Sequence, residues 1–186
     1  MIWSNEEKYN KIIDGMALGY GVPTPLIKGI IAKESSFNPT VSKDEPQIQD
    51  KSRGLMQVLF KTAQNLGHNG TPDDLFKPDV NIMLGTKLLA ENLQRTKGNV
   101  EAAVAAYNAG WRWWNKKLPI PNLDYVNDVK VYTSYFAKKL PESDVLMYIK
   151  SKKTGRVLPG GATTFFYLSE LLPPSHGCCS DERGKA

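Results

Sequence analysis

Apolar side chains recur every three or four residues along most of the chain, the spacing that places them on one face of an α-helix. The longest such pattern covers residues 78–97, and another runs from about Leu123 to Leu140. An earlier one follows residues 4–7, where the run Ser-Asn-Glu-Glu has the form of a capping box. The periodicity therefore predicts a mainly α fold.

Glu34 is an ionisable residue at a position where the helical pattern expects a hydrophobic one. The helix predicted over residues 24–34 has Thr24 as its N-cap and Pro25 at its first position. Its apolar stripe consists of Ile27, Ile30 and Ile31. Glu34 extends that stripe, and burial at the C-terminal end of a helix raises the pKa of a carboxyl group. Such a group is suited to general acid catalysis, whereas the alternative is a Glu at a fraying helix end that turns toward water.

Turn-forming and charged residues dominate residues 37–53, which are predicted to form an irregular loop. Gly54 then opens a short helical turn. Asn99 is the predicted N-cap of a helix over residues 100–109, which Gly110 ends. Alanines on nearly every side of that helix indicate that neighbouring elements enclose it.

The hydrophobic pattern changes after Pro141. Two β-like runs follow, at residues 145–149 and 163–167, with glycines between them. We therefore expect a helical domain over residues 1–140. Residues 141–186 are predicted to be an accessory segment of β or irregular structure that ends in a flexible tail.

Three short motifs carry a resemblance to a known family. They are Glu-Ser followed by Phe-Asn-Pro at residues 34–39, Gly-Leu-Met-Gln at 54–57, and Ala-Tyr-Asn-Ala-Gly at 106–110. In this order and at this separation, the chain from about Pro23 to Tyr135 resembles the soluble lytic transglycosylases. The resemblance implies a lysozyme-like helical lobe and cleavage of the glycan strands of peptidoglycan at the bacterial cell wall.

The resemblance assigns the chemistry to one carboxyl group. Glu34 would protonate the leaving oxygen of the β-1,4 bond between N-acetylmuramic acid and N-acetylglucosamine. It would then take the proton from the muramic acid 6-hydroxyl, whose attack closes a 1,6-anhydro ring. A tethered hydroxyl outcompetes water because its effective concentration is high. The resemblance implies no cofactor and no metal.

Other residues receive substrate-binding roles from the same resemblance. Met56 and Gln57 match the pair that lines the family's cleft, with Met56 keeping the surroundings of the acid dry. Tyr107 has a hydroxyl that could orient Glu34, and Asn108 has an amide suited to an N-acetyl group. A structural role is the alternative for each of these residues taken singly.

Two further positions belong to this set. Ser35 could hydrogen-bond near the acid or the substrate, and Tyr125 matches a family tyrosine near the catalytic Glu. The Glu that the family usually has one turn ahead of this tyrosine is missing, with Pro121 and Asn122 in that stretch. The match at Tyr125 is therefore weaker than the match at Glu34.

Two other functions stay open. A goose-type lysozyme would hydrolyse the same bond with a second acid, and Asp44, Glu45 and Asp50 lie in what looks like an insertion over residues 43–51. That loop is expected to be solvated and mobile, and Leu59 stands where the goose-type group has an Asp. The other alternative is an inactive wall-binding or structural module.

Three tryptophans lie directly after the alanine-rich helix, namely Trp111, Trp113 and Trp114. Their faces could stack on sugar rings, and three neighbouring cations, Arg112, Lys116 and Lys117, could meet carboxylates. The alternative is that at least one tryptophan closes the hydrophobic core at this corner.

Composition and charge limit the classes of molecule that the chain is expected to bind. The chain of 186 residues carries a formal net charge of +5, which favours an anionic polymer such as the bacterial wall. Nucleic acid is not expected because no nucleic-acid motif is present. No apolar run approaches membrane-spanning length, and a monomer is expected.

Neither end of the chain carries a recognisable signal peptide, metal site or disulfide framework. Acidic residues near the N-terminus stand where a signal peptide needs basic ones. We therefore expect export by another route: packaging in a phage particle, a secretion system, endolysin-like release on lysis, or a missing upstream segment. His176, Cys178 and Cys179 supply too few ligands for a structural zinc site, and adjacent cysteines give no disulfide framework.

Overall fold

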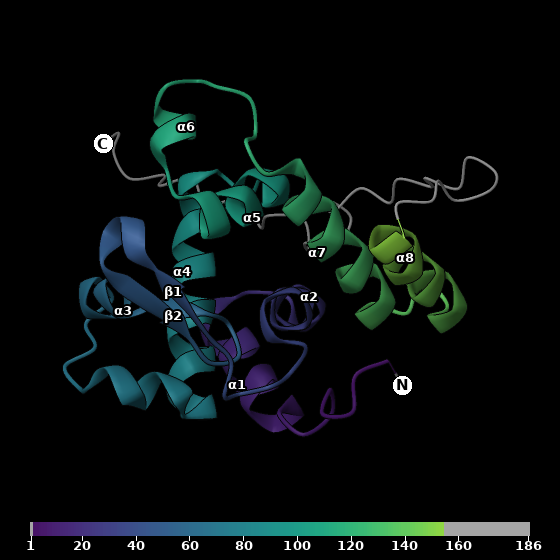
Figure 1. The fold of residues 1–186 in the computed structure, drawn as a ribbon, viewed down its shortest axis with the longest axis horizontal. Helices are drawn as coiled ribbons and strands as arrows, with labels where there is room; N and C mark the ends of the chain where they lie inside the picture. Colours follow the sequence, from purple (N-terminus) through teal and green to yellow (C-terminus); the bar gives the residue numbers. More distant parts are fainter. Residues whose placement is uncertain (1, 155–186) are drawn as a thin grey trace, which may run out of the picture.

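The computed structural model describes residues 2–154, and most of them are helical (Figure 1). The α-helices are α1 (Asn10–Tyr20), α2 (Thr24–Ser35), α3 (Phe60–Asn65), α4 (Pro78–Arg95), α5 (Val100–Ala109), α6 (Arg112–Asn115), α7 (Leu123–Phe136) and α8 (Glu142–Thr154). Two 3₁₀ turns, η1 (Pro46–Ile48) and η2 (Pro72–Phe76), and three strands, β1 (Ser42–Glu45), β2 (Asp50–Arg53) and β3 (Val58–Leu59), complete the described part. The prediction of a mainly α, lysozyme-like fold is confirmed. No helix within residues 2–154 combines the length and apolar character that crossing a bilayer requires.

Helices α2 and α7 pack against each other at very short range. Gly29 makes this possible, because a Cβ at that position would collide with the hydroxyl and backbone of Thr133. The predicted apolar stripe of α2 is completely buried, as shown by Ile27, Ile30 and Ile31. The packing brings the C-terminal turn of α2 beside the first turns of α7. Helix α5 is enclosed as its alanines predicted, and the Asn99 side chain caps it by accepting the Ala102 N–H at 3.0 Å.

The predicted starts of the first two helices are wrong. The helix α2 already includes Thr24, whose hydroxyl donates to Asp14 of α1 at 2.9 Å instead of capping its own helix. Residues 4–9 form successive turns, and α1 begins only at Asn10. The Glu6 carboxylate accepts the Trp3 N–H at 3.4 Å, so within the predicted capping box Glu6 bonds the residue before the box.

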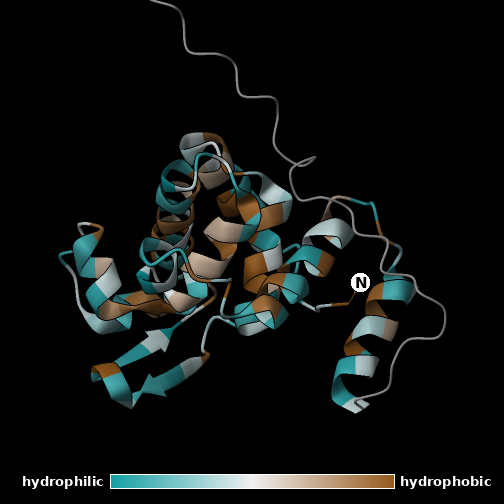
Figure 2. Cartoon of the chain, turned by 90° about the horizontal axis from the view of Figure 1, so that it is seen from above, coloured by the Kyte–Doolittle hydropathy of each residue, from teal (hydrophilic) through white to brown (hydrophobic). Residues whose placement is uncertain are grey.

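The predicted irregular loop over residues 37–53 is instead largely an antiparallel hairpin, β1–β2, which β3 extends to a three-stranded sheet. The register pairs Ser42 with Arg53 and Glu45 with Asp50. Its strands lack the alternation of apolar and polar residues that reveals a half-buried strand, and in Figure 2 they are coloured mostly as hydrophilic. Cross-strand charge pairing supports them, as between Lys51 and Asp44 at 3.1 Å.

The β-like interpretation of residues 145–149 is also wrong, because they lie within α8. Pro141 directly precedes α8. The first turn of α8 is acidic and its last turn is basic, and both complement the helix dipole. Val145 is fully buried, and the Tyr148 hydroxyl donates to Asp128 of α7 at 2.7 Å. The second β-like run, at residues 163–167, lies outside the described residues, as do His176, Cys178 and Cys179. The division into two parts at residue 140 stays a prediction.

Candidate active site

Glu34 lies in the last turn of α2, where it is half-buried and bonded to α7. The Tyr125 hydroxyl donates to its Oε1 atom at 2.6 Å. Burial raises the pKa of the Glu34 carboxyl to about 7, although the hydrogen bond from Tyr125 and the charges of Lys33 and Lys43 each lower it. The charge of Glu45 on β1 raises it slightly further. A carboxyl group with this pKa can both give and take a proton near neutral pH.

The tyrosine that bonds Glu34 is Tyr125, which the family match placed near the acid, and not Tyr107, which was predicted to orient it. Tyr125 is buried and holds Glu34, whereas the Tyr107 hydroxyl donates to the Met56 carbonyl at 2.8 Å. Burial raises the pKa of both phenols well above the usual value, and the Glu34 charge adds to this. Both tyrosines therefore stay protonated hydrogen-bond donors in any physiological solution.

Asn81 fixes the turn that carries the Gly-Leu-Met-Gln motif, and the sequence reasoning missed it. This fully buried side chain accepts the Met56 N–H at 2.7 Å and donates to the carbonyls of Arg53 at 2.8 Å and Leu75 at 2.7 Å. Gly54 is required there, because a Cβ would collide with Asn81 and the Leu75 carbonyl. An amide on the apolar side of a long helical pattern was the available signal, the same kind of signal that singled out Glu34.

Ser35 and Gln57 are engaged in holding the backbone. Ser35 is buried, and its hydroxyl donates to the Leu55 carbonyl at 2.8 Å, which ties α2 to the motif turn. The Gln57 amide donates to the carbonyls of Val41 and Gly54, both at 2.9 Å, and accepts from the Ser52 hydroxyl at 3.0 Å. The polar atoms of both side chains are thus already bonded to protein.

Met56 and Asn108 differ in exposure. Met56 is fully buried, and its thioether packs against Gly85 of α4. Asn108 is exposed at the end of α5, where its oxygen accepts from Asn122 at 2.9 Å. The Asn108 amide N–H₂ donates to no residue in the described range, so it faces solvent as a free donor.

The three candidate second acids have different surroundings. Asp44 is 80% exposed and pairs with Lys51. Asp50 does not fit the expected solvated loop: its side chain is only 6% exposed. Burial alone would raise the pKa of Asp50, but backbone N–H donors from Lys61, Lys51 and Phe60 outweigh it and lower the pKa. Glu45, bonded to Lys43 at 2.9 Å, is the one of the three whose charge acts on Glu34.

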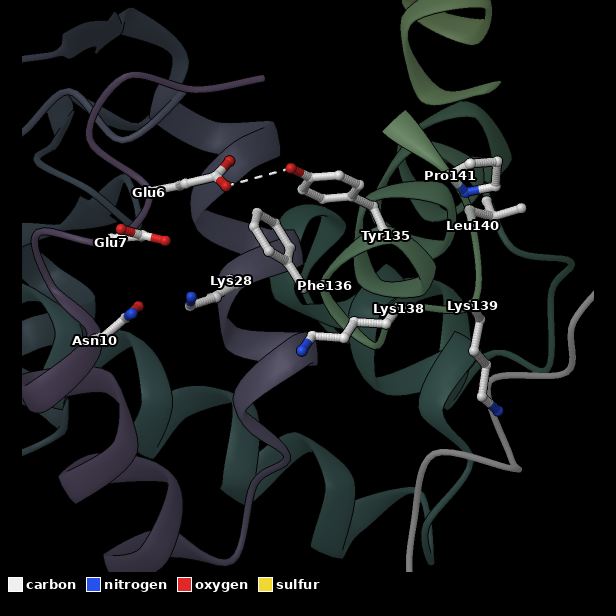
Figure 3. Close-up of a pocket in the computed structure, with 10 residues that line it drawn as sticks. All are labelled: Glu6, Glu7, Asn10, Lys28, Tyr135, Phe136, Lys138, Lys139, Leu140 and Pro141. Atoms are coloured by element: carbon white, nitrogen blue, oxygen red, sulfur yellow. Dashed lines mark hydrogen bonds between the residues drawn. The ribbon is translucent and has the colours of Figure 1, made fainter. Parts of the chain in front are cut away.

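A cavity of about 550 Å³ lies apart from this group (Figure 3). It is bounded by the N-terminal segment, α2 and the end of α7, where the Tyr135 hydroxyl donates to Glu6 at 3.3 Å. Lys28 lies 5.3 Å from the centre of the Phe136 ring in the same wall. None of the predicted site residues lines it. Within residues 2–154, no group of three or more His, Cys, Asp or Glu side chains could hold a metal ion.

Comparisons with known proteins agree with the motifs. The family model described as the transglycosylase SLT domain matches residues 11–119. A membrane-bound lytic murein transglycosylase C from Edwardsiella ictaluri is 36% identical over 118 residues, which are 55% of this chain and 31% of that relative. The chain therefore spans less than a third of the length of that relative.

Two solved structures have a similar fold. The 70-kDa soluble lytic transglycosylase from Escherichia coli aligns with a TM-score of 0.57 at 28% identity, over 69% of this chain and 24% of that one. An inactive mutant of the lytic transglycosylase Slt from Pseudomonas aeruginosa aligns with a TM-score of 0.61 at 27% identity, over 70% of this chain and 24% of that one. The similarity thus reaches past the residues that the family model matches.

Proposed function

The chain belongs to the transglycosylase SLT domain family, and from that membership we propose that it is a peptidoglycan lytic transglycosylase. It cleaves the β-1,4 bond between N-acetylmuramic acid and N-acetylglucosamine and leaves 1,6-anhydromuramic acid ends. The partner is the glycan strand of the bacterial cell wall, where the enzyme acts. An association with a phage or a secretion system stays a prediction.

The observation that carries this proposal is the burial of Glu34 beside Tyr125, which raises the pKa of its carboxyl group. A carboxyl group with a pKa of about 7 still holds its proton in a large fraction of molecules at neutral pH. It can therefore protonate the glycosidic oxygen while positive charge builds at the anomeric carbon, which the substrate's own acetamido group stabilises. The ionised Glu34 then accepts the proton of the muramic acid 6-hydroxyl, and the 1,6-anhydro ring closes.

The neighbouring side chains support this cycle in different ways. Tyr125 holds the carboxyl group in one orientation through both halves of the reaction, because its phenol remains a donor. Asn108 offers a free amide N–H₂ to an N-acetyl carbonyl of the substrate. Tyr107 fixes the Met56 carbonyl and so shapes the surroundings of the acid. In this proposal Ser35 and Gln57 act by positioning the motif turn.

A hydrolase is the second candidate, and the observation that favours it is the effect of Glu45 on the pKa of Glu34. A carboxylate within electrostatic range of the acid could align a water molecule for attack on the sugar. The ion pair with Lys43 works against this role, because it occupies the carboxylate that would have to accept a proton.

The two candidates are distinguished by digesting purified peptidoglycan in heavy-oxygen water and weighing the products. We expect anhydro ends without label, because ring closure uses no water. Labelled reducing ends as the main product would support the hydrolase, and Glu45→Gln would then be the variant to abolish them. Absence of any soluble product, with wall binding retained, would instead support an inactive wall-binding module.

A further inference from the structure

Helix α6 presents an ordered group of tryptophans just beyond the candidate site. It lies past the end of α5, and therefore past Asn108 (Figure 1). Trp113 is only 7% exposed and belongs to the core, so for this tryptophan the alternative of closing the core is confirmed. The Trp114 ring is edge-on to Trp113 at 5.7 Å and edge-on to Trp111 at 6.2 Å, and it is only partly buried. Contacts with Trp111 and Trp113 thus fix the orientation of the Trp114 ring, one face of which stays partly open.

A cavity of about 520 Å³ opens beside these rings. It is lined by Trp113, Trp114, Asn115, Lys117 and Leu118. Leu118 is 53% exposed, and Asn115 is also exposed. The lining therefore combines apolar faces with an amide and a cation, the mixture that small-molecule sites use for orientation.

Two polar features of this corner lack protein partners. The Trp113 indole N–H is buried and donates to no acceptor in the described part of the chain. An unpaired buried donor costs free energy. Nearby, Arg112, Lys116 and Lys117 are exposed and form no ion pair with any residue from 2 to 154.

We propose that the cavity at α6 is a distal sugar subsite, which binds an N-acetylhexosamine unit of the glycan strand beyond the unit that contacts Asn108. A pyranose ring has an apolar C–H face that packs on an indole and polar edges that need donors and acceptors. The cations meet the carboxylates of the peptide stems that such a strand carries. This proposal rests on the proposed function, since both concern one glycan.

The test uses the full chain with Glu34→Gln, so that binding is measured without cleavage. The probe is a hexamer of β-1,4-linked N-acetylglucosamine, followed by intrinsic tryptophan fluorescence. Three of the four tryptophans lie in or beside α6, while Trp3 packs against Phe37 and Phe136 in the core. We expect the hexamer to change the emission, and Trp114→Ala to weaken binding by about tenfold.

The matched control is Trp111→Phe, at the N-cap of the same helix. Trp111 does not line the cavity, and its ring packs against the Arg95 guanidinium at 4.5 Å. Phe at this position keeps an aromatic ring beside Trp114. This variant should bind the hexamer like the parent protein. Leu118→Asp provides a second test that leaves the core alone, because it puts a carboxylate in the exposed wall of the cavity. It should weaken hexamer binding to the same degree as Trp114→Ala.

Unchanged hexamer affinity in Leu118→Asp, or in a folded Trp114→Ala, would overturn the proposal. Equal losses in Trp114→Ala and Trp111→Phe would also overturn it, because they would indicate a general disturbance of α6. Cleavage of peptidoglycan by the parent chain is measured separately. An enzyme that cleaves the wall without this subsite refutes only the inference, and hexamer binding at α6 without wall cleavage refutes only the proposed function.

Discussion

The Tyr125 hydroxyl lies 2.6 Å from Oε1 of Glu34 and joins two helices whose contact residues are 91 positions apart in the chain. Two opposed effects meet at this contact. Burial raises the pKa of the carboxyl, and the hydrogen bond stabilises the ionised form and so limits that rise. The balance leaves a pKa of about 7, which allows one residue to serve as acid and then as base.

Tyr125→Phe should raise the pKa of Glu34 above 7, because it removes the hydrogen bond that lowers it. The proton-donating form of Glu34 would then persist to higher pH. We expect the alkaline limb of the pH–rate profile to move upward and kcat to fall by about tenfold or more, since the carboxyl loses its fixed orientation.

Tyr107→Phe is the matched control for that change. Its hydroxyl donates to the Met56 carbonyl and not to Glu34, so the variant should lose activity without moving the alkaline limb. The measurement is the pH dependence of muropeptide release by both variants. An unmoved limb in Tyr125→Phe would contradict the role that the contact assigns to it.

Glu34→Gln should abolish wall cleavage and stabilise the fold at alkaline pH. The folded pKa is raised from 4.5 to about 7, so the stability that Glu34 contributes is complete below pH 4.5 and is lost as pH rises through 7. Gln does not ionise, so the variant does not lose stability over this pH range. We expect the variant to exceed the parent by about 1–3 kcal/mol in free energy of unfolding at pH 8.

The check is denaturant unfolding of the parent and the variant at pH 4 and pH 8. The difference between them should be larger at pH 8 than at pH 4. A constant difference would mean that Glu34 titrates near its ordinary value in the folded state.

The sequence predicts best what local periodicity determines. The stripe of α2 places Glu34 correctly because its position depends only on helical spacing. The hairpin was missed because its strands are paired by charges across the turn, and local pattern does not reveal such pairing. For α8, a short apolar run at residues 145–149 fits a strand and a helix equally well, and the buried contact of Val145 decides between them.

Most hydrogen-bond partners of the predicted site residues were not predicted, although the family match did place Tyr125 near Glu34. Helical and motif spacing select Tyr107 and Tyr125 alike, and only the packing of α2 on α7 decides which hydroxyl reaches Glu34. The role of Asn81 was not predicted because its three backbone partners lie on segments that are distant or irregular. Long-range hydrogen bonds of this kind leave no periodic mark in one sequence.

Asn81→Ala should destabilise the protein and also lower its activity. The substitution leaves the Met56 N–H and the carbonyls of Arg53 and Leu75 buried without their partner. We expect a loss of about 3 kcal/mol in free energy of unfolding. Asn92→Ala is the control, because that buried amide donates to the Ala103 carbonyl away from the motif turn. Under conditions where both variants are folded, only Asn81→Ala should lose activity, and equal activities would contradict the positioning role.

Lys33→Met should raise the pKa of Glu34, because the Lys33 charge is one of the interactions that lower it. The Lys33 ammonium lies 2.6 Å from Asp128, which also accepts from Tyr148 of α8. This contact fixes the charge of Lys33 beside Glu34. We expect the alkaline limb of the pH–rate profile to move upward by a fraction of a pH unit.

Lys28→Met is the matched control for Lys33→Met. It removes the same charge from the same helix, but Lys28 lies over the Phe136 ring and is not among the groups that shift the pKa of Glu34. Its alkaline limb should coincide with that of the parent protein at low ionic strength. An equal shift in both variants would show that net charge, and not the placement of Lys33 by Asp128, sets the pKa of the acid.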